Sequence, residues 1–300
     1  MPAFPQFRPV EIEDRENIES LFTAMQPEVS ELNFTNLYMF RHVHDYRLSL
    51  LNGNLLIMAK SYSKVPYLFP PIGDSMVPET VSAMMDYMRG LGEDPVVSIA
   101  WKGFIDRHIA GSGEYVFEAD PDSADYVYDT GELIELSGRK FHDKKNLKNR
   151  FVKTYKGRFE YRRLTTELVT EAMELTGEWC RGKCTVDSPS TFGETEATMC
   201  ALESLDSLST KGGVVLVDGK VQALSLGEEL NRNMAVVHVE KANADLQGLY
   251  QYMSSEFLAR EFSGYRSVNR EQDLGEPNLR KSKLSYNPIR MVEKYTIRPK

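Results

Sequence analysis

The elements that decide the fold lie in residues 234–271, MAVVHVEKANADLQGLYQYMSSEFLAREFSGYRSVNRE. Residues 234–242 read as a largely apolar strand, residues 246–262 as a helix and residues 265–271 as a second strand. One face of the expected helix carries a stripe of core residues, namely Leu246, Leu249, Tyr250, Met253 and Phe257. A strand, a helix and a strand in this order indicate layers of helices packed on a sheet.

Outward from this segment, the chain repeats one order of elements twice: strand, two helices, three mostly antiparallel strands, then helix, strand, helix and strand. Each half has a hairpin with a tight-turn signal, Asn52-Gly53 in the first and Asp218-Gly219 in the second. The order resembles that of the GNAT-type acyltransferase fold. We therefore expect an α+β protein with α/β layers, built from two tandem GNAT-like domains whose sheets are mixed and largely antiparallel.

The repeat also predicts the domain boundary. Residues 1–137 are expected to form an N-terminal GNAT-like domain, which ends soon after a strand over residues 124–129. Residues 138–300 are expected to form a C-terminal GNAT-like domain that carries the site and closes with a strand over residues 291–298. Residues 138–156 are predicted to be a basic linker helix between the two.

Charge is distributed unevenly along the 300 residues, whose formal net charge is −8. Residues 139–163 hold 11 basic and 2 acidic side chains (net +9), and residues 279–300 hold 7 and 1 (net +6). The remaining chain holds 18 basic and 41 acidic side chains, a net charge of −23. Because salt screens charges beyond about 10 Å, a phosphate-rich partner responds to the local density of Lys and Arg. The alternative is that each basic segment is a solvated helix face.

The composition excludes some classes of protein. The 14 Phe, 15 Tyr and many aliphatic residues exclude a disordered chain, and no stretch approaches the ~18 apolar residues of a membrane span. The start of the chain lacks the basic and apolar regions of a secretory signal, and three cysteines without framework spacing fit a reducing compartment. We therefore expect a cytoplasmic protein. Cys180 and Cys184 have no His close in sequence, so no metal site is expected.

Polar side chains leave the second strand of the 234–271 segment in a continuous run. The run consists of Asn269, Arg270, Glu271, Gln272 and Asp273. Such a run is costly at the end of a core strand unless it faces a cleft or water, and Glu240 ends the neighbouring strand. A site is therefore expected at the C-terminal ends of these strands, with an exposed loop as the alternative. His238, inside the apolar strand, is expected to be a core histidine.

Three blocks of the sequence resemble a known family. They are LIELSGRKFHDKKNLKNRF (133–151), AVVHVEKANADLQGLYQYM (235–253) and VNREQDLGEPNLRKSKLSYNP (268–288). These blocks look like the C-terminal domain family of phosphatidylglycerol lysyltransferases and, more distantly, Fem-type peptidoglycan aminoacyltransferases. The resemblance implies transfer of an aminoacyl group from aminoacyl-tRNA to an amine or hydroxyl. It also implies that Lys283, with Pro288 behind it, matches a lysine of the family's active centre.

Acyl transfer needs a base, a positive group for the developing oxyanion and an acid for the leaving group. Glu240 is the candidate base and Asp273 the second candidate, while Lys283 or Arg280 would stabilise the oxyanion or hold the leaving group. Tyr286 is the candidate acid, as in GNAT enzymes. Substrate-binding residues are expected among the nearby polar side chains: Asn269, Arg270, Glu271, Arg280 and Lys281. The alternatives are a surface ion pair for Glu240 and a packing role for Tyr286.

The functional hypotheses differ in the donor of the acyl group. Residues 244–249 hold one glycine and an acid where a CoA-binding turn needs glycines around pyrophosphate, which weakens CoA binding. An aminoacyl-tRNA acceptor end would instead be attracted to the first basic segment, through Lys144, Lys145, Lys148 and Arg150. The leading hypothesis is thus an aminoacyltransferase that uses aminoacyl-tRNA and needs no resident cofactor. An acetyl-CoA-dependent N-acyltransferase and a non-catalytic binding module are the alternatives, and the acceptor (small molecule, lipid headgroup or peptide) and the oligomeric state stay open.

Overall fold

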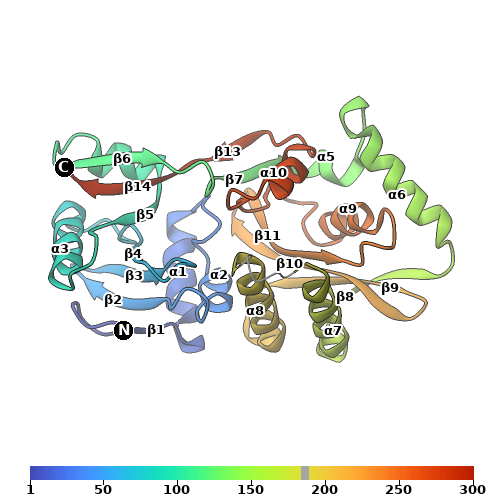
Figure 1. Ribbon diagram of the computed structural model, residues 1–300, viewed down its shortest axis with the longest axis horizontal. Helices are drawn as coiled ribbons and strands as arrows, with labels where there is room; N and C mark the ends of the chain where they lie inside the picture. The colour runs from blue at the N-terminus through green and yellow to red at the C-terminus, as the bar shows by residue number, and fades with distance from the viewer. Residues whose placement is uncertain (184–188) are drawn as a thin grey trace.

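The computed structural model describes residues 1–183 and 189–300, and it contains two seven-stranded sheets, one at each side of the view in Figure 1. In spatial order, the first sheet consists of β1 (Arg8–Pro9), β2 (Arg47–Leu51), β3 (Asn54–Lys60), β4 (Pro66–Leu68), β5 (Val97–Trp101), β14 (Lys294–Pro299) and β6 (Tyr115–Ala119). The second consists of β13 (Arg290–Val292), β7 (Asp125–Asp129), β12 (Ser267–Asn269), β11 (Met234–Ala242), β10 (Lys220–Asn231), β9 (Lys211–Val217) and β8 (Phe159–Arg163).

Helices cover both sheets. They are α1 (Arg15–Met25), α2 (Phe34–Met39), α3 (Val77–Gly90), α4 (Lys102–Phe104), α5 (Thr130–Glu135), α6 (His142–Thr154), α7 (Thr166–Lys183), α8 (Pro189–Glu203), α9 (Leu249–Glu261) and α10 (Pro277–Leu284). Short helical turns span Ile12–Asp14, Ile105–Ile109, Arg139–Phe141 and Leu205–Ser207. The predicted basic linker segment therefore contains a helix, α6, which packs against α9 on one face of the second sheet.

The sequence explains the two tight hairpins. Asn52 and Gly53 between β2 and β3 have φ values of 53° and 79°, and Asp218 and Gly219 between β9 and β10 have values of 51° and 78°. Two consecutive left-handed residues are what a type I′ turn requires, and Asn, Asp and Gly adopt them at least cost. Both hairpin predictions are confirmed.

Each sheet combines antiparallel strands with a parallel pair, β4–β5 in the first and β11–β12 in the second. Residues 234–236 of β11 lie beside residues 267–269 of β12, and Leu68 of β4 lies beside Val97 of β5. The predicted fold class, two GNAT-like units in tandem with mixed and largely antiparallel sheets, is confirmed.

The two sheets exchange strands. Strand β7, which precedes residue 137, pairs with β12 and β13 in the second sheet, whereas the last strand, β14, pairs with β5 and β6 in the first. The chain therefore crosses between the sheets near residue 120 and again near residue 293 (Figure 1). The division at residue 137 stays a prediction about the repeat, and the sheets do not follow it.

A hydrophobic core joins the two halves. One continuous cluster contains Leu37 and Ile57 from the first half together with Ala201, Leu224 and Val236 from the second. Helices α1 and α2 thus lie between the sheets and pack toward α8, with α2 in direct contact with it. Because burial of this cluster requires both halves, the space between them has a defined shape.

Candidate functional site

The second sheet opens where β11 and β12 stop pairing. Strand β12 ends at Asn269, whereas β11 continues to Ala242. The register between β10 and β11 shifts at Leu226 and Gly227, which leaves His238 as the extra residue of a β-bulge. The bulge turns the side chain of His238 out of the regular alternation of β11, and the polar run begins where β12 ends.

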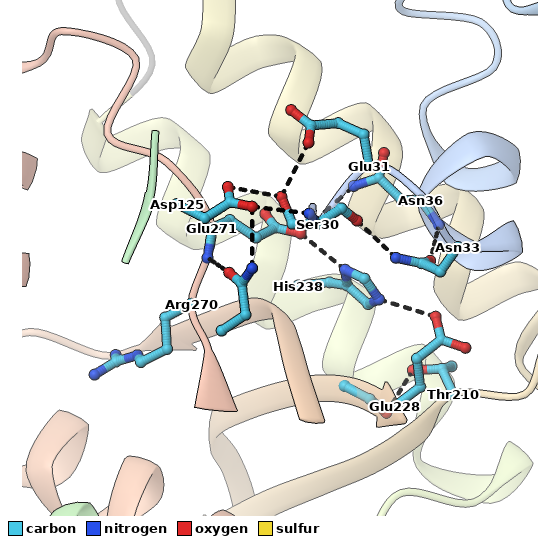
Figure 2. Close-up of polar contacts among 12 residues, drawn as sticks. Ser30, Glu31, Asn33, Asn36, Asp125, Thr210, Glu228, His238, Arg270 and Glu271 are labelled. Carbon is cyan, nitrogen blue, oxygen red and sulfur yellow. Dashed lines mark hydrogen bonds and ion pairs between the residues drawn. The ribbon is translucent and has the colours of Figure 1, made fainter. Parts of the chain in front are cut away.

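Consecutive residues of that run point to opposite sides of the C-terminal end of β12. Figure 2 shows Arg270 pointing away from the group formed by His238 and Glu271. Glu271 has a left-handed φ of 57°, an uncommon backbone conformation for a non-glycine residue. The predicted substrate-binding residues Arg270 and Glu271 therefore lie in two different environments.

On the Glu271 side, His238 bridges two carboxylates. Its Nδ1 lies 2.8 Å from Oε1 of Glu271, and its Nε2 lies 2.9 Å from Oε1 of Glu228 on β10 (Figure 2). Burial lowers the pKa of His238, but the hydrogen bonds that its ring donates to the two carboxylates outweigh burial and raise that pKa to about 9. His238 is buried as predicted, yet it is a charged partner of Glu271 rather than an apolar core residue.

A buried lysine organises the charges next to this bridge. Lys294 of β14 lies 2.6 Å from Glu31 and 2.7 Å from Asp125, and all three side chains are almost fully buried. Burial raises the pKa of Glu31 to about 7, against the opposing effect of Lys294. The Ser30 hydroxyl donates to Asp125 at 2.9 Å, and the Asn269 amide donates to it at 3.0 Å.

Two of these groups, Glu31 and Glu271, border a cavity of about 380 Å³ between the two halves. Its walls come from α2, β4, β5 and the loop after β12. The carboxylates in its wall are Glu31, Asp120 and Glu271, and the aromatic side chains are Phe40, His44, Tyr46, Tyr62 and Tyr67. Arg298 is the arginine of the wall and forms an exposed ion pair with Asp94 at 3.5 Å. The cavity is thus acidic and aromatic.

Lys283 lies between the two sides of the β12 end. Its ammonium group donates to the Arg270 carbonyl, and the Tyr128 hydroxyl donates to the Lys283 carbonyl at 2.9 Å. Burial and the Arg270 guanidinium lower the pKa of Lys283 to about 8, although Glu271, Asp125 and Glu240 oppose this effect. An amine with that pKa exists in both protonation states near neutral pH.

On the Arg270 side, four of the predicted residues gather. Arg270 pairs with Glu240 at 3.0 Å, and their side chains are only 15% and 14% exposed. The Arg270 guanidinium carbon lies 5.0 Å from the centre of the Tyr286 ring, whose hydroxyl accepts a hydrogen bond from Gln251 at 3.4 Å. Lys144 of α6 lies 4.3 Å from the centre of the same ring. The two basic segments therefore meet at Tyr286.

Two predicted residues instead hold the loop together. Asp273 is fully buried and accepts hydrogen bonds from the Tyr126 hydroxyl at 2.5 Å, from Arg280 at 2.7 Å and from the Gly275 amide at 2.9 Å. Burial alone would raise the pKa of Asp273, and these hydrogen bonds lower it, so the carboxylate stays ionised. Arg280 also donates to Asp122 at 2.6 Å. Asp273 and Arg280 thus fix the loop after β12.

The remaining predicted residues lie apart from the cavity. Asn269 is fully buried, where its amide donates to the Glu28 carbonyl and its oxygen accepts from the Glu271 amide. Lys281 is exposed on α10. In α6, Lys148 donates to Ser255 at 2.6 Å and Arg150 donates to Gln247 at 2.8 Å, and Lys145 is exposed.

Helix α6 covers the N-terminus of α9. Gly248, the N-cap of α9, has a φ of 91°, and a Cβ added there would lie 2.0 Å from the Leu147 carbonyl oxygen of α6. Backbone amides at a helix N-terminus attract anions when a ligand can reach them. Here the chain itself occupies that position.

The structure adds candidate site residues that the sequence pattern did not single out, namely Glu31, Asp125, Glu228 and Lys294, and it gives His238 a charged partner on each side. A charged side chain inside a strand, such as Lys294 in β14, is the sequence feature that could have indicated such a residue. Its partners Glu31 and Asp125 could not be identified in this way because they are distant in sequence. In residues 1–183 and 189–300, no cluster of three or more His, Cys, Asp or Glu side chains could hold a metal ion, and Cys184 lies outside these ranges. Within the same ranges, no helix has the length and hydropathy that a membrane span needs.

Comparisons with known proteins agree with the fold. The family model described as phosphatidylglycerol lysyltransferase, C-terminal, matches residues 22–298. A conserved protein of unknown function from Bacteroides thetaiotaomicron is 28% identical, and its structure matches with a TM-score of 0.89 over 98% of this chain and 99% of that chain. The C-terminal domain of a putative lysylphosphatidylglycerol synthetase from Agrobacterium fabrum is 14% identical, with a TM-score of 0.64 over 95% and 90% of the two chains.

One curated relative matches in part. An uncharacterized protein of Mycoplasmoides gallisepticum is 25% identical over 179 residues, which are 59% of this chain and 56% of that protein. The chain therefore spans just over half the length of the relative. The resemblance expected from the three sequence blocks is confirmed by the family model.

Proposed function

Since the chain belongs to the phosphatidylglycerol lysyltransferase C-terminal family, whose model matches residues 22–298, we propose that it transfers an aminoacyl group from aminoacyl-tRNA to an amine or hydroxyl acceptor. The observation that carries this proposal is the acidic and aromatic cavity between the halves. An aminoacyl-tRNA donor is also consistent with the predicted cytoplasmic location.

The cavity suits an aminoacyl group because every such group has a cationic α-ammonium. Asp120 and Glu271, whose Oε1 is the oxygen next to His238, offer carboxylate oxygens to that ammonium, and rings such as those of Tyr62 and Tyr67 offer faces that attract cations. An acetyl group is neutral and gains nothing from this lining. Acidic walls would also repel the phosphates of CoA.

Lys283 is the favoured group for proton transfer. A pKa of about 8 lets its neutral amine take the proton of an acceptor hydroxyl as that oxygen attacks the ester carbonyl. The proton then passes to the departing ribose oxygen as the carbonyl–oxygen bond breaks, so the exchange of one ester for another balances. Glu240 is the weaker base candidate because its carboxylate is already paired with Arg270.

Two further observations favour aminoacyl-tRNA over CoA as the donor. In the second half, the Glu240–Arg270 ion pair bridges the gap between β11 and β12, which the chain of a bound CoA would otherwise enter. The N-terminus of α9, where a pyrophosphate would need backbone amides, is covered by the Leu147 carbonyl. A non-catalytic binding module would have no need for a lysine whose pKa is lowered to about 8.

The test is discharge of radiolabelled aminoacyl-tRNAs by the purified protein in the presence of a cell extract as the source of acceptor. At least one aminoacyl-tRNA should be discharged, and Lys283→Met should slow discharge by roughly 100-fold or more. The exposed Lys220, in the β9–β10 hairpin, provides a control as Lys220→Met.

Three results would count against the proposal. The first is no discharge of any aminoacyl-tRNA, and the second is equal discharge by wild type and Lys283→Met. The third is saturable binding of acetyl-CoA in calorimetry, which would favour the N-acyltransferase alternative.

A further inference from the structure

We propose that His238 is a positioning residue for the aminoacyl site: fixed by Glu228, it holds the Glu271 carboxylate where that carboxylate receives the α-ammonium of the aminoacyl group. The inference rests on the proposed aminoacyl transfer and adds to it two residues that do not line the cavity. The side chain of His238 is fully buried behind the cavity wall, whereas Glu271 is part of that wall.

The main chain of Glu271 is fixed on both sides. Its amide donates to Oδ1 of Asn269 at 2.7 Å, and its carbonyl accepts a hydrogen bond from the Tyr126 amide at 3.2 Å. The φ of 57° costs energy for a residue with a Cβ, so these contacts must maintain it, and such backbone strain is concentrated at functional sites. The backbone therefore directs the side chain of Glu271 to the cavity wall.

The Glu271 carboxylate is held through one of its two oxygens. Oε1 accepts a hydrogen bond from Nδ1 of His238 at 2.8 Å and a weak one from the Asn36 amide at 3.5 Å. In the part of the chain that the structure describes, no hydrogen bond reaches Oε2. Since the side chain is 16% exposed and lines the cavity, Oε2 is available to an ammonium group.

Glu228 fixes the ring of His238 from the opposite side. Its Oε1 lies 2.9 Å from Nε2, and the side chains of His238 and Glu228 are 0% and 7% exposed (Figure 2). Burial lowers the pKa of His238, but the two carboxylates raise that pKa to about 9, so both ring nitrogens donate at neutral pH. The ring cannot rotate without the loss of a charged hydrogen bond, and its Nδ1 therefore holds Glu271 in one position.

The charge of this group suits a cationic ligand. Two carboxylates and one imidazolium carry a net charge of −1, and Glu271 is the member that faces the cavity. A histidine that only packs would need neither carboxylate, and burial of two acids is costly without a cation to pair with them. Glu228 instead lines a second cavity, of about 130 Å³, beside α1. It can therefore be altered without any change to the side chains of the aminoacyl cavity.

Binding of an amino-acid amide tests the inference without any aminoacyl donor. From a panel of amides, the one that binds wild type is titrated by calorimetry at pH 7, and its N-acetylated form, which lacks the ammonium, is the ligand control. The side-chain amide of Asn places its donor near the position of Nδ1, and that of Gln near the position of Nε2. His238→Asn therefore keeps a donor toward Glu271, and His238→Gln keeps one toward Glu228. Glu228→Gln removes the charge behind His238, and Glu229→Gln, on the same strand and in the same second cavity, is the matched control.

We expect His238→Gln to weaken binding of the amide by about tenfold and His238→Asn by about threefold. Glu228→Gln should weaken it by about threefold from outside the cavity, and Glu229→Gln should leave it unchanged. In a Glu271→Gln background, His238→Gln should cause no further loss, because His238 acts through Glu271. The acetylated form should bind wild type and the variants equally weakly.

Three results would overturn the inference. The first is equal losses in His238→Asn and His238→Gln, and the second is a loss from His238→Gln that persists in the Glu271→Gln background. The third is that no amide binds wild type, or that the acetylated form binds as tightly as the amide. If His238→Gln does not fold, equal affinities of Glu228→Gln and Glu229→Gln would overturn the inference in the same way. Because no aminoacyl-tRNA is present, these results are independent of whether the protein discharges one.

Discussion

The two sides of the β12 end differ in charge although they are one residue apart in sequence. On one side, Glu271 faces an acidic and aromatic cavity, held there by His238. On the other side, Arg270 and Lys144 lie against the Tyr286 ring, and Glu240 forms an ion pair with Arg270. A short strand can thus separate two opposite electrostatic environments, with Lys283 at the boundary.

The largest expected effect comes from breaking the charge balance on the cavity side. Lys294→Met would leave Glu31 and Asp125 buried without their cation, which should lower the free energy of unfolding by about 3–5 kcal/mol. Chemical denaturation measures this loss. Arg290→Met, which removes an exposed pair with Glu28, should cost less than about 1 kcal/mol. Similar losses for the two variants would mean that the buried charges are not coupled.

The second effect depends on pH. The folded pKa of His238 is about 9, above its unfolded value of 6.5, so the charged His238 stabilises the fold fully below pH 6.5. This contribution, of order 3 kcal/mol, is lost as the pH rises through about 9. Wild type should therefore exceed His238→Gln in unfolding free energy at pH 6, and the gap should narrow by pH 9.5. A gap that stays constant with pH would show that His238 is not charged in the folded protein.

The third and smallest effect concerns a ligand of the cavity. Glu271→Gln should weaken binding of an amino-acid amide, chosen from a panel of amides as the one that binds, by about tenfold because a charged hydrogen bond is lost. Lys144→Met, on the other side of the β12 end, should leave binding of the amide unchanged. Calorimetry measures both variants. Equal losses in the two variants would mean that the two sides act as one site.

Local features of the fold could be predicted from the sequence. The hairpin at Asn52-Gly53 follows from residues that tolerate a left-handed backbone, and the burial of Leu249 and Met253 follows from helical spacing. The exchange of β7 and β14 could not be predicted, because pairing partners depend on tertiary packing while strand propensity is local. The repeated order of elements alone predicts two self-contained domains.

The site was predictable only in part. The polar run after β12 pointed to Arg270 and Glu271, and the basic segments pointed to Lys144. The charged role of His238 depends on a bulge and on Glu228 of the neighbouring strand, and neither leaves a periodic signal in one sequence. Lys294 forms an ion pair with Glu31, which is more than 260 residues away in sequence, so this pairing could be seen only in the folded chain.

The exchanged last strand has a consequence for biosynthesis. Strand β14 lies between β5 and β6, so the first sheet has a gap until the C-terminal residues are available. Strand β14 is synthesised about 175 residues after β6, and contacts of such high sequence separation form slowly. The first sheet should therefore stay incomplete until β14 has been synthesised. Stalled or truncated nascent chains would leave β5 and β6 without their central partner, exposed to chaperones or to aggregation.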